Sequence, residues 1–178
     1  MVRAVSALLL NVVNVNYGIN MATIFISIGS NINAHENIRL ALDDLGGVFS
    51  NILNSTYYES EAVGFDGDNF INLVTQAETN FDIPTVAEKL HAIEDQHGRD
   101  RSGPKFSSRT IDLDLLLYDD AIYENGKLQI PRDEILTNAF VLWPLAELIP
   151  DKLHPVIQQS YGDLWQKFDK SSQSLWPI

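Results

Sequence analysis

The chain contains no cysteine among its 178 residues. It therefore forms no disulfide, uses no catalytic thiolate and builds no zinc site with cysteine ligands. It also lacks an apolar run long enough to span a bilayer, a G-x-x-x-x-G-K-[S/T] phosphate loop and a G-x-G-x-x-G turn. Its four histidines are scattered, which does not favour a histidine-based zinc site.

Basic residues are also few. Twelve lysines and arginines stand against 24 aspartates and glutamates, which gives a formal net charge of -12. Proteins that bind nucleic acid usually present a basic face, so we expect no nucleic-acid partner. A small nucleotide is compatible with this charge, because a metal ion can supply positive charge locally. The hydrophobic content of 45% is enough for a folded core, and the length suggests one domain.

The N-terminal 20 residues differ from the rest. A single arginine precedes the apolar run AVSALLL, and Met21 stands directly before the first convincing strand. We interpret residues 1–20 as a loose extension or an upstream start, and residues 21–178 as a single domain. A short signal peptide is the alternative for residues 1–20.

Hydrophobic periodicity predicts an α+β fold. The order β-α-β-β-α-β, followed by a hairpin and C-terminal helices, predicts a ferredoxin-like α/β sandwich with a mainly antiparallel sheet. We expect Gly46-Gly47 to end the first helix, Asp82 to cap the second, and the apolar helix near the C-terminus to start at Pro144. The expected strands are 23–28, 52–61, 70–79 and 110–118. The expected helices are 35–45, 82–98, one within the apolar segment 138–150, and 161–168, and the hairpin turns at Asn125-Gly126.

Two aspartates interrupt the apolar strand RTIDLDLLLY. Asp112 and Asp114 are two residues apart, so both project from one face of the strand, while Ile111, Leu113, Leu115 and Leu117 fill the other. A pair of carboxylates about 7 Å apart can hold one or two hard cations. An acidic stripe on a solvated sheet face is the alternative.

A basic segment leads into this strand. Residues 99–109 hold four of the twelve cations, and arginines bind phosphate oxygens bidentately. Cations beside a carboxylate pair favour a polyphosphate site with magnesium. A surface loop whose arginines merely pair with the aspartates is the alternative.

The motif GRDR(x)7RTIDLDLLLY resembles the signature of the 6-hydroxymethyl-7,8-dihydropterin pyrophosphokinase family. FISIGSN, STYYES, NFINLVTQAET, HAIEDQHGR and AFVLWPLAELIPD match the family in the same order, from about Thr23 to the C-terminal helix. The resemblance implies a magnesium-dependent pyrophosphokinase of folate biosynthesis, which transfers pyrophosphate from ATP to the pterin hydroxymethyl group and releases AMP.

The resemblance also implies roles for particular residues. Asp112 and Asp114 would hold two Mg²⁺ ions, and Arg99 and Arg109 would act with them in catalysis. The implied ATP-binding residues are Glu94, Arg101, Phe106, Leu115, Lys127 and Arg132. The implied pterin-binding residues are Ser60, Val63, Phe70, Asn72 and Phe140. The expected partners are these small molecules, with no membrane, and the expected state is a cytoplasmic monomer.

Some positions depart from the family pattern. Ser107-Ser108 replaces a usual Gly-Pro, and Asn138 stands where an arginine is expected. We hypothesise that Arg132 partly supplies the missing charge. The departures leave three alternatives: a weakly active paralogue that binds pterin or nucleotide, a non-catalytic ferredoxin-like interaction module, and a different metal-dependent nucleotidyl transferase.

Overall fold

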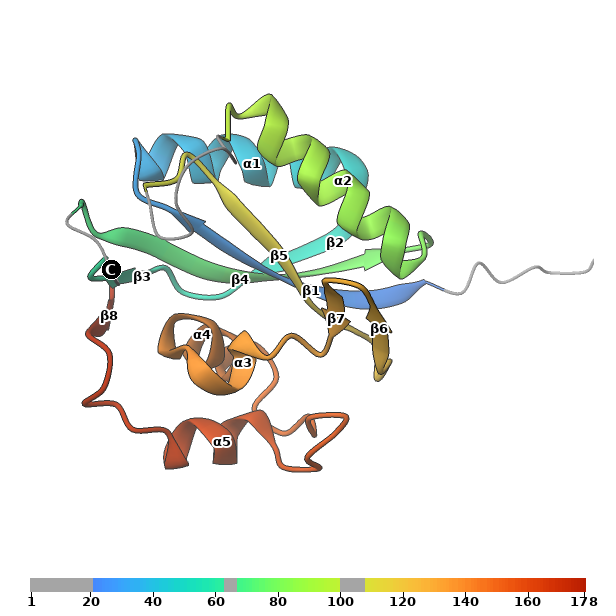
Figure 1. Ribbon diagram of the computed structural model, residues 1–178, viewed down its shortest axis with the longest axis vertical. Helices are drawn as coiled ribbons and strands as arrows, with labels where there is room; N and C mark the ends of the chain where they lie inside the picture. Colours follow the sequence, from blue (N-terminus) through green and yellow to red (C-terminus); the bar gives the residue numbers. More distant parts are fainter. Residues whose placement is uncertain (1–20, 63–66, 100–107) are drawn as a thin grey trace, which may run out of the picture.

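The structure of the protein is a computed structural model that describes residues 21–62, 67–99 and 108–178 (Figure 1). Three predicted site residues, Val63, Arg101 and Phe106, lie outside these ranges, as does the predicted extension 1–20. Among the described residues, no helix is both long and apolar enough to cross a membrane.

A six-stranded sheet forms the centre of the fold. Its strand order is β5-β1-β4-β3-β8, with β2 also paired to β4, and all of these pairings are antiparallel. The mixed helix and antiparallel-sheet class predicted from the sequence is therefore confirmed. The strands are β1 (Ala22–Ser30), β2 (Ser50–Asn54), β3 (Tyr58–Ser60), β4 (Phe70–Thr79), β5 (Asp112–Tyr118) and β8 (Leu175–Pro177).

Helices cover both faces of this sheet (Figure 1). α1 (Ala34–Val48) and α2 (Ile83–Gln96) cover one face. The opposite face is covered by α3 (Glu134–Thr137) and α4 (Ala139–Leu148), and α5 (Tyr161–Lys167) packs on α4, farther from the sheet. The predicted hairpin is present as β6 (Tyr123–Asn125) and β7 (Leu128–Ile130). Each layer has its own apolar core against the sheet.

The helix ends differ in part from the sequence predictions. Asp82 does cap α2, because its side chain accepts a hydrogen bond of 3.0 Å from the Thr85 amide. However, α1 continues through Gly46-Gly47 to Val48, since burial of Ile38, Ala41 and Leu45 outweighs the poor helix propensity of glycine.

The last apolar helix and the second strand also differ. α4 begins at Ala139 rather than at Pro144, which lies inside the helix and forgoes one backbone hydrogen bond. The predicted strand 52–61 is divided into β2 and β3 at Ser55. The Ser55 hydroxyl accepts a 3.0 Å bond from the Val74 amide, and this side-chain bond takes the place of a strand-to-strand one.

A β-bulge in the pairing of β1 with β5 changes the face of the sheet to which the last side chains of β5 point. Ile111, Leu113 and Leu115 pack with the α1–α2 core as predicted. The prediction for Leu117 is wrong, because the register with β1 shifts between Phe25 and Ile26, and Leu117 then packs in the α4 core. Helix α4 therefore covers the Leu116–Leu117 end of the strand.

Candidate active site

A cleft of about 940 Å³ lies beside the aspartate end of β5. This volume suits a small-molecule site. The sheet, the side chains of Arg99 and Arg109, the α3–α4 region and the C-terminal residues 171–175 all contribute to its walls. The lining residues from the sheet are Ser27, Gly29, Ser60, Phe70, Asn72, Asp112, Asp114 and Leu116.

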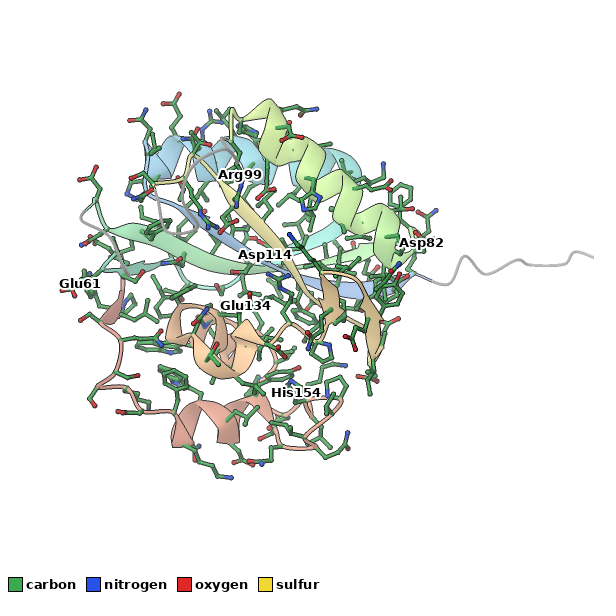
Figure 2. The ribbon with its side chains drawn as sticks, in the orientation of Figure 1. Glu61, Asp82, Arg99, Asp114, Glu134 and His154 are labelled. Carbon is green, nitrogen blue, oxygen red and sulfur yellow. The ribbon has the colours of Figure 1, made fainter. Side chains whose placement is uncertain are left out.

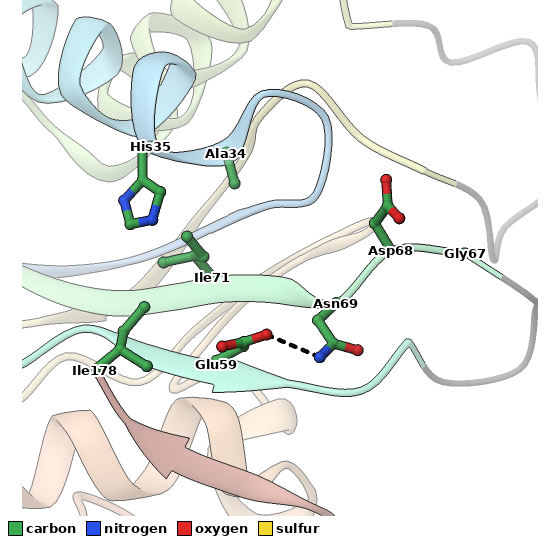
Figure 3. A pocket seen from close by; sticks show the side chains of 8 residues that line it. All are labelled: Ala34, His35, Glu59, Gly67, Asp68, Asn69, Ile71 and Ile178. Atoms are coloured by element: carbon green, nitrogen blue, oxygen red, sulfur yellow. Dashed lines mark hydrogen bonds between the residues drawn. The ribbon is translucent and has the colours of Figure 1, made fainter.

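A second hollow of about 530 Å³ lies at the other face of β3 and β4 (Figure 3). Its polar side chains include Glu59, Asp68 and Asn69, and Glu59 accepts a 2.8 Å bond from Asn69. Among the described residues that line it, His35 alone can carry positive charge. The hollow is therefore poorly suited to an anionic substrate, and the cleft beside β5 is the better candidate.

Gly29 forms the centre of the cleft floor. In the sheet it lies opposite Asn72 of β4 on one side and Asp112 of β5 on the other. A Cβ at this position would lie 3.3 Å from the Asn72 Oδ1 and 3.9 Å from the Asp112 Cβ. The missing side chain therefore leaves room above the floor, between an amide and a carboxylate.

Asp112 lies between two arginines. Arg99 pairs with its Oδ1 and Arg109 with its Oδ2. Arg99 is itself held from behind, because its Nη1 donates to Glu94 Oε1 at 2.7 Å and to the Ile111 carbonyl at 2.9 Å. The cation is thus fixed at the cleft wall by groups from both α2 and β5.

Glu94 is the buried anchor of this arrangement. It is only 3% exposed, and its Oε1 also accepts a 2.9 Å bond from the Leu113 amide. A buried carboxylate is stable when it is paired and hydrogen-bonded in this way. Glu94 therefore lies beneath the cleft and orients Arg99.

Asp114 lines the cleft with 43% of its side chain exposed, and its Oδ1 lies 3.0 Å from Arg132 Nη2. Figure 2 shows Asp114 at the sheet and Glu134 in the helical layer that faces it. Arg132 also contacts Glu134 at 3.1 Å. Partial burial between the cleft walls, and then the charge of Asp112, raise the pKa of Asp114 to about 6, while the charge of Arg132 opposes the rise. A cation bound beside Asp114 would stabilise its ionised carboxylate, which burial and Asp112 disfavour.

We expect the Asp114 carboxyl of the metal-free protein to titrate near pH 6 in a ¹³C NMR pH titration. Its pKa in the folded protein lies above the ordinary value of 3.8, so protonation favours the folded state. The ionised Asp114 carboxylate therefore destabilises the folded state. This effect is complete above about pH 6 and is lost as the pH falls towards 4. Asp82 is the internal control, because hydrogen bonds from Thr85 lower its pKa. Titration of Asp114 near pH 4 would contradict the assignment.

The donor set fits a hard cation that is shared with a substrate. Two carboxylates can bind Mg²⁺ when phosphate oxygens and water complete its coordination. Within the described part of the chain, no group of three or more His, Asp or Glu side chains is placed to hold a metal ion. Two carboxylates alone do not complete the coordination of Mg²⁺, so a metal bound here needs phosphate oxygens or water as further ligands.

Another part of the cleft is lined by two aromatic rings and a side-chain amide. Phe70 and Phe140 line it, and both are partly buried. Asn72 is 4% exposed, and its Nδ2 donates to the Ser60 hydroxyl at 3.0 Å. Flat rings beside a fixed amide suit a flat heterocycle with hydrogen-bonding edges.

The structure brings most of the described predicted residues to one cleft. Those that line it are Ser60, Phe70, Asn72, Arg99, Arg109, Asp112, Asp114, Arg132 and Phe140. Three predicted ATP-binding residues do not line it: Glu94 is buried beneath the cleft, Leu115 is buried in the α1–α2 core, and Lys127 is exposed in the β6–β7 turn. Sequence reasoning missed Ser27, Gly29, Glu134, Thr137 and residues 171–175.

Comparison with known proteins gives consistent results. Residues 25–150 match the family model described as 7,8-dihydro-6-hydroxymethylpterin-pyrophosphokinase (HPPK). The chain is 32% identical over 141 residues to the 2-amino-4-hydroxy-6-hydroxymethyldihydropteridine pyrophosphokinase of Aquifex aeolicus, covering 78% of this chain and 88% of that one. It is 32% identical over 139 residues to the enzyme of the same name from Haemophilus influenzae, covering 76% and 86%.

Solved structures show the same fold. Wild-type Plasmodium falciparum HPPK-DHPS, solved with pterin and p-hydroxybenzoate, superposes with a TM-score of 0.67 at 15% identity. The match covers 83% of this chain and 43% of that chain, so this chain spans less than half of the Plasmodium protein.

Proposed function

Because the chain belongs to the 7,8-dihydro-6-hydroxymethylpterin-pyrophosphokinase family, we propose that its cleft is the active site of pyrophosphoryl transfer. ATP is the co-substrate, the hydroxymethyl group of the dihydropterin is the acceptor, and AMP is released. We further propose that the reaction depends on two Mg²⁺ ions held by Asp112 and Asp114. The observation that carries the proposal is the carboxylate pair beside Arg99, Arg109 and Arg132 in one cleft.

The proposed reaction is an in-line substitution at phosphorus. The pterin hydroxyl oxygen attacks the β-phosphorus of ATP, and its proton passes to solvent water. The bond from that phosphorus to the α-phosphate oxygen breaks, and AMP leaves with the electron pair. When bound, Mg²⁺ supplies Lewis-acid neutralisation of the phosphate charge. The guanidinium groups of Arg99, Arg109 and Arg132 donate to phosphate oxygens and orient them.

The pterin is proposed to bind at Phe70, Phe140, Asn72 and Ser60. The Ser60 hydroxyl accepts from Asn72 Nδ2, so the amide is held with its oxygen available to the cleft floor at Gly29. A fixed amide recognises a heterocycle edge at a lower entropic cost than a mobile one.

Replacement of Gly29 by alanine is expected to raise the KM for the pterin about tenfold, because the added methyl group pushes the Asn72 amide out of place. The free energy of unfolding should change by less than about 1 kcal/mol, since alanine is tolerated in a strand. Steady-state kinetics and urea unfolding measure the two effects. Gly47→Ala is the control, because an added Cβ there meets nothing within 4 Å. Equal KM values for the two variants would contradict the assigned pterin position.

The direct test of the function is product analysis. Incubation with ATP, Mg²⁺ and hydroxymethyldihydropterin should yield AMP and the pterin diphosphate. Release of ADP or of free pyrophosphate would contradict the reaction and indicate another transferase. Binding of both substrates without AMP release would indicate a weakened paralogue. The compensation of Asn138 by Arg132, the cytoplasmic location and the monomeric state stay predictions.

A further inference from the structure

The C-terminal segment Ser171–Leu175 forms one wall of the cleft. The family match ends at residue 150, so this segment lies outside it. After α5 the chain turns back towards the sheet and joins it as β8, beside β3 (Figure 1). A part of the chain that the family signature does not describe therefore borders the proposed site.

Both ends of this segment are anchored. At one end, Phe168 stacks on Trp165 at 5.7 Å, and the Asp169 carboxylate accepts a 3.0 Å bond from the Ser171 amide. At the other end, β8 pairs with β3, which places Leu175 opposite Ser60. The segment is thus held across the cleft rather than hanging free.

Gln173 connects the segment to the start of α4. Its Oε1 accepts a 2.8 Å hydrogen bond from the Ala139 amide, and its Nε2 donates at 2.8 Å to the Thr137 carbonyl. The first amides of a helix have no partner within the helix, and the Asn138 side chain does not cap α4. Gln173 supplies a cap that the local sequence lacks.

We propose that Gln173 is a positioning residue for the pterin. Its two bonds fix the backbone on either side of Asn138, and the next residues of α4 carry Phe140 into the cleft wall. The same segment supports the other side of the pterin position, because Leu175 pairs with Ser60, which holds Asn72. The inference rests on the proposed function.

The proposed role of Gln173 concerns the binding of the pterin and not the binding of the nucleotide. Arg99 and Arg109 are held by Glu94 of α2 and Asp112 of β5, whereas Gln173 bonds to the start of α4. Loss of the Gln173 bonds should therefore weaken pterin binding and leave nucleotide binding unchanged. A side chain that only stabilised the fold would weaken both.

The test compares Gln173→Met with the wild type. Methionine keeps the bulk of glutamine but makes neither bond, so we expect the KM for the pterin to rise about tenfold with kcat within about threefold. Calorimetric Kd values for a non-hydrolysable ATP analogue with Mg²⁺ should agree within about twofold. Gln159→Met is the matched control, because Gln159 is exposed and its side-chain oxygen accepts a hydrogen bond from the surface residue Lys167. It should leave both substrates unaffected.

A second variant tests the hydrogen bonds singly. Gln173→Glu keeps an acceptor for the Ala139 amide but loses the donor to Thr137, so its KM should lie between those of wild type and Gln173→Met. An unchanged pterin KM in Gln173→Met, or an equal loss of pterin and nucleotide affinity, would overturn the inference alone. Absence of AMP release by the wild type would overturn the proposed function and this inference together.

Discussion

Replacement of Asp114 by asparagine is expected to lower kcat/KM by about three orders of magnitude. The amide keeps the shape of the side chain but removes the negative charge that we propose to hold Mg²⁺. Removal of one element of the electrostatic stabilisation of a transition state commonly costs a factor of about 10² to 10³. Among the described residues, Arg132, 3.0 Å away, would also lose one of its two carboxylate partners and keep only Glu134. AMP release measured over a range of Mg²⁺ concentrations checks the prediction.

Asp120→Asn is the matched control for this variant. Asp120 follows the same strand, but it lies at the surface, where it pairs with Lys152 at 2.6 Å. It should retain wild-type kinetics. Asp114→Asn with near-normal turnover and an unchanged Mg²⁺ dependence would show that this carboxylate is not a metal ligand.

Replacement of Glu94 by leucine is expected to lower the free energy of unfolding by about 3 kcal/mol. The change removes an acceptor from the buried Leu113 amide and one carboxylate from Arg99. A buried group left without its partner costs its full desolvation penalty. Since Arg99 would then lose its orientation towards the cleft, kcat/KM should also fall. Urea unfolding and AMP release measure the two effects.

Two further variants make this test specific. Glu94→Gln keeps an oxygen for the Leu113 amide and should recover part of the stability but not the charge pair with Arg99. Glu88→Leu places the same new side chain on an exposed position of α2 and should leave both quantities nearly unchanged. A Glu94→Leu protein as stable as Glu88→Leu would contradict the anchoring role of Glu94.

The sequence best predicted the positions of site residues that lie on a single strand. The spacing of Asp112 and Asp114 fixes them on one face by the period of a strand, and the structure places both in the cleft. The resemblance added Asn72 and Phe140, which are distant in sequence and meet only through sheet pairing and the start of α4.

The remaining features depend on tertiary packing. Nothing local signals the bulge that moves Leu117 to the other face, because it arises from pairing with Phe25 and Ile26. Gly29 within the strand FISIGSN did carry a signal, since a glycine inside a strand often marks a close approach. Gln173 carried none, because its partners lie more than thirty residues earlier in the chain.

The most direct test of the metal site is paramagnetic broadening by Mn²⁺, added as a substitute for Mg²⁺ together with a non-hydrolysable ATP analogue. The amide signals of Gly29, Leu113 and Asp114 should broaden first in a two-dimensional NMR spectrum, because these residues surround the carboxylate pair. Broadening centred on His35, Glu59 and Asp68, in the second hollow, would contradict the account.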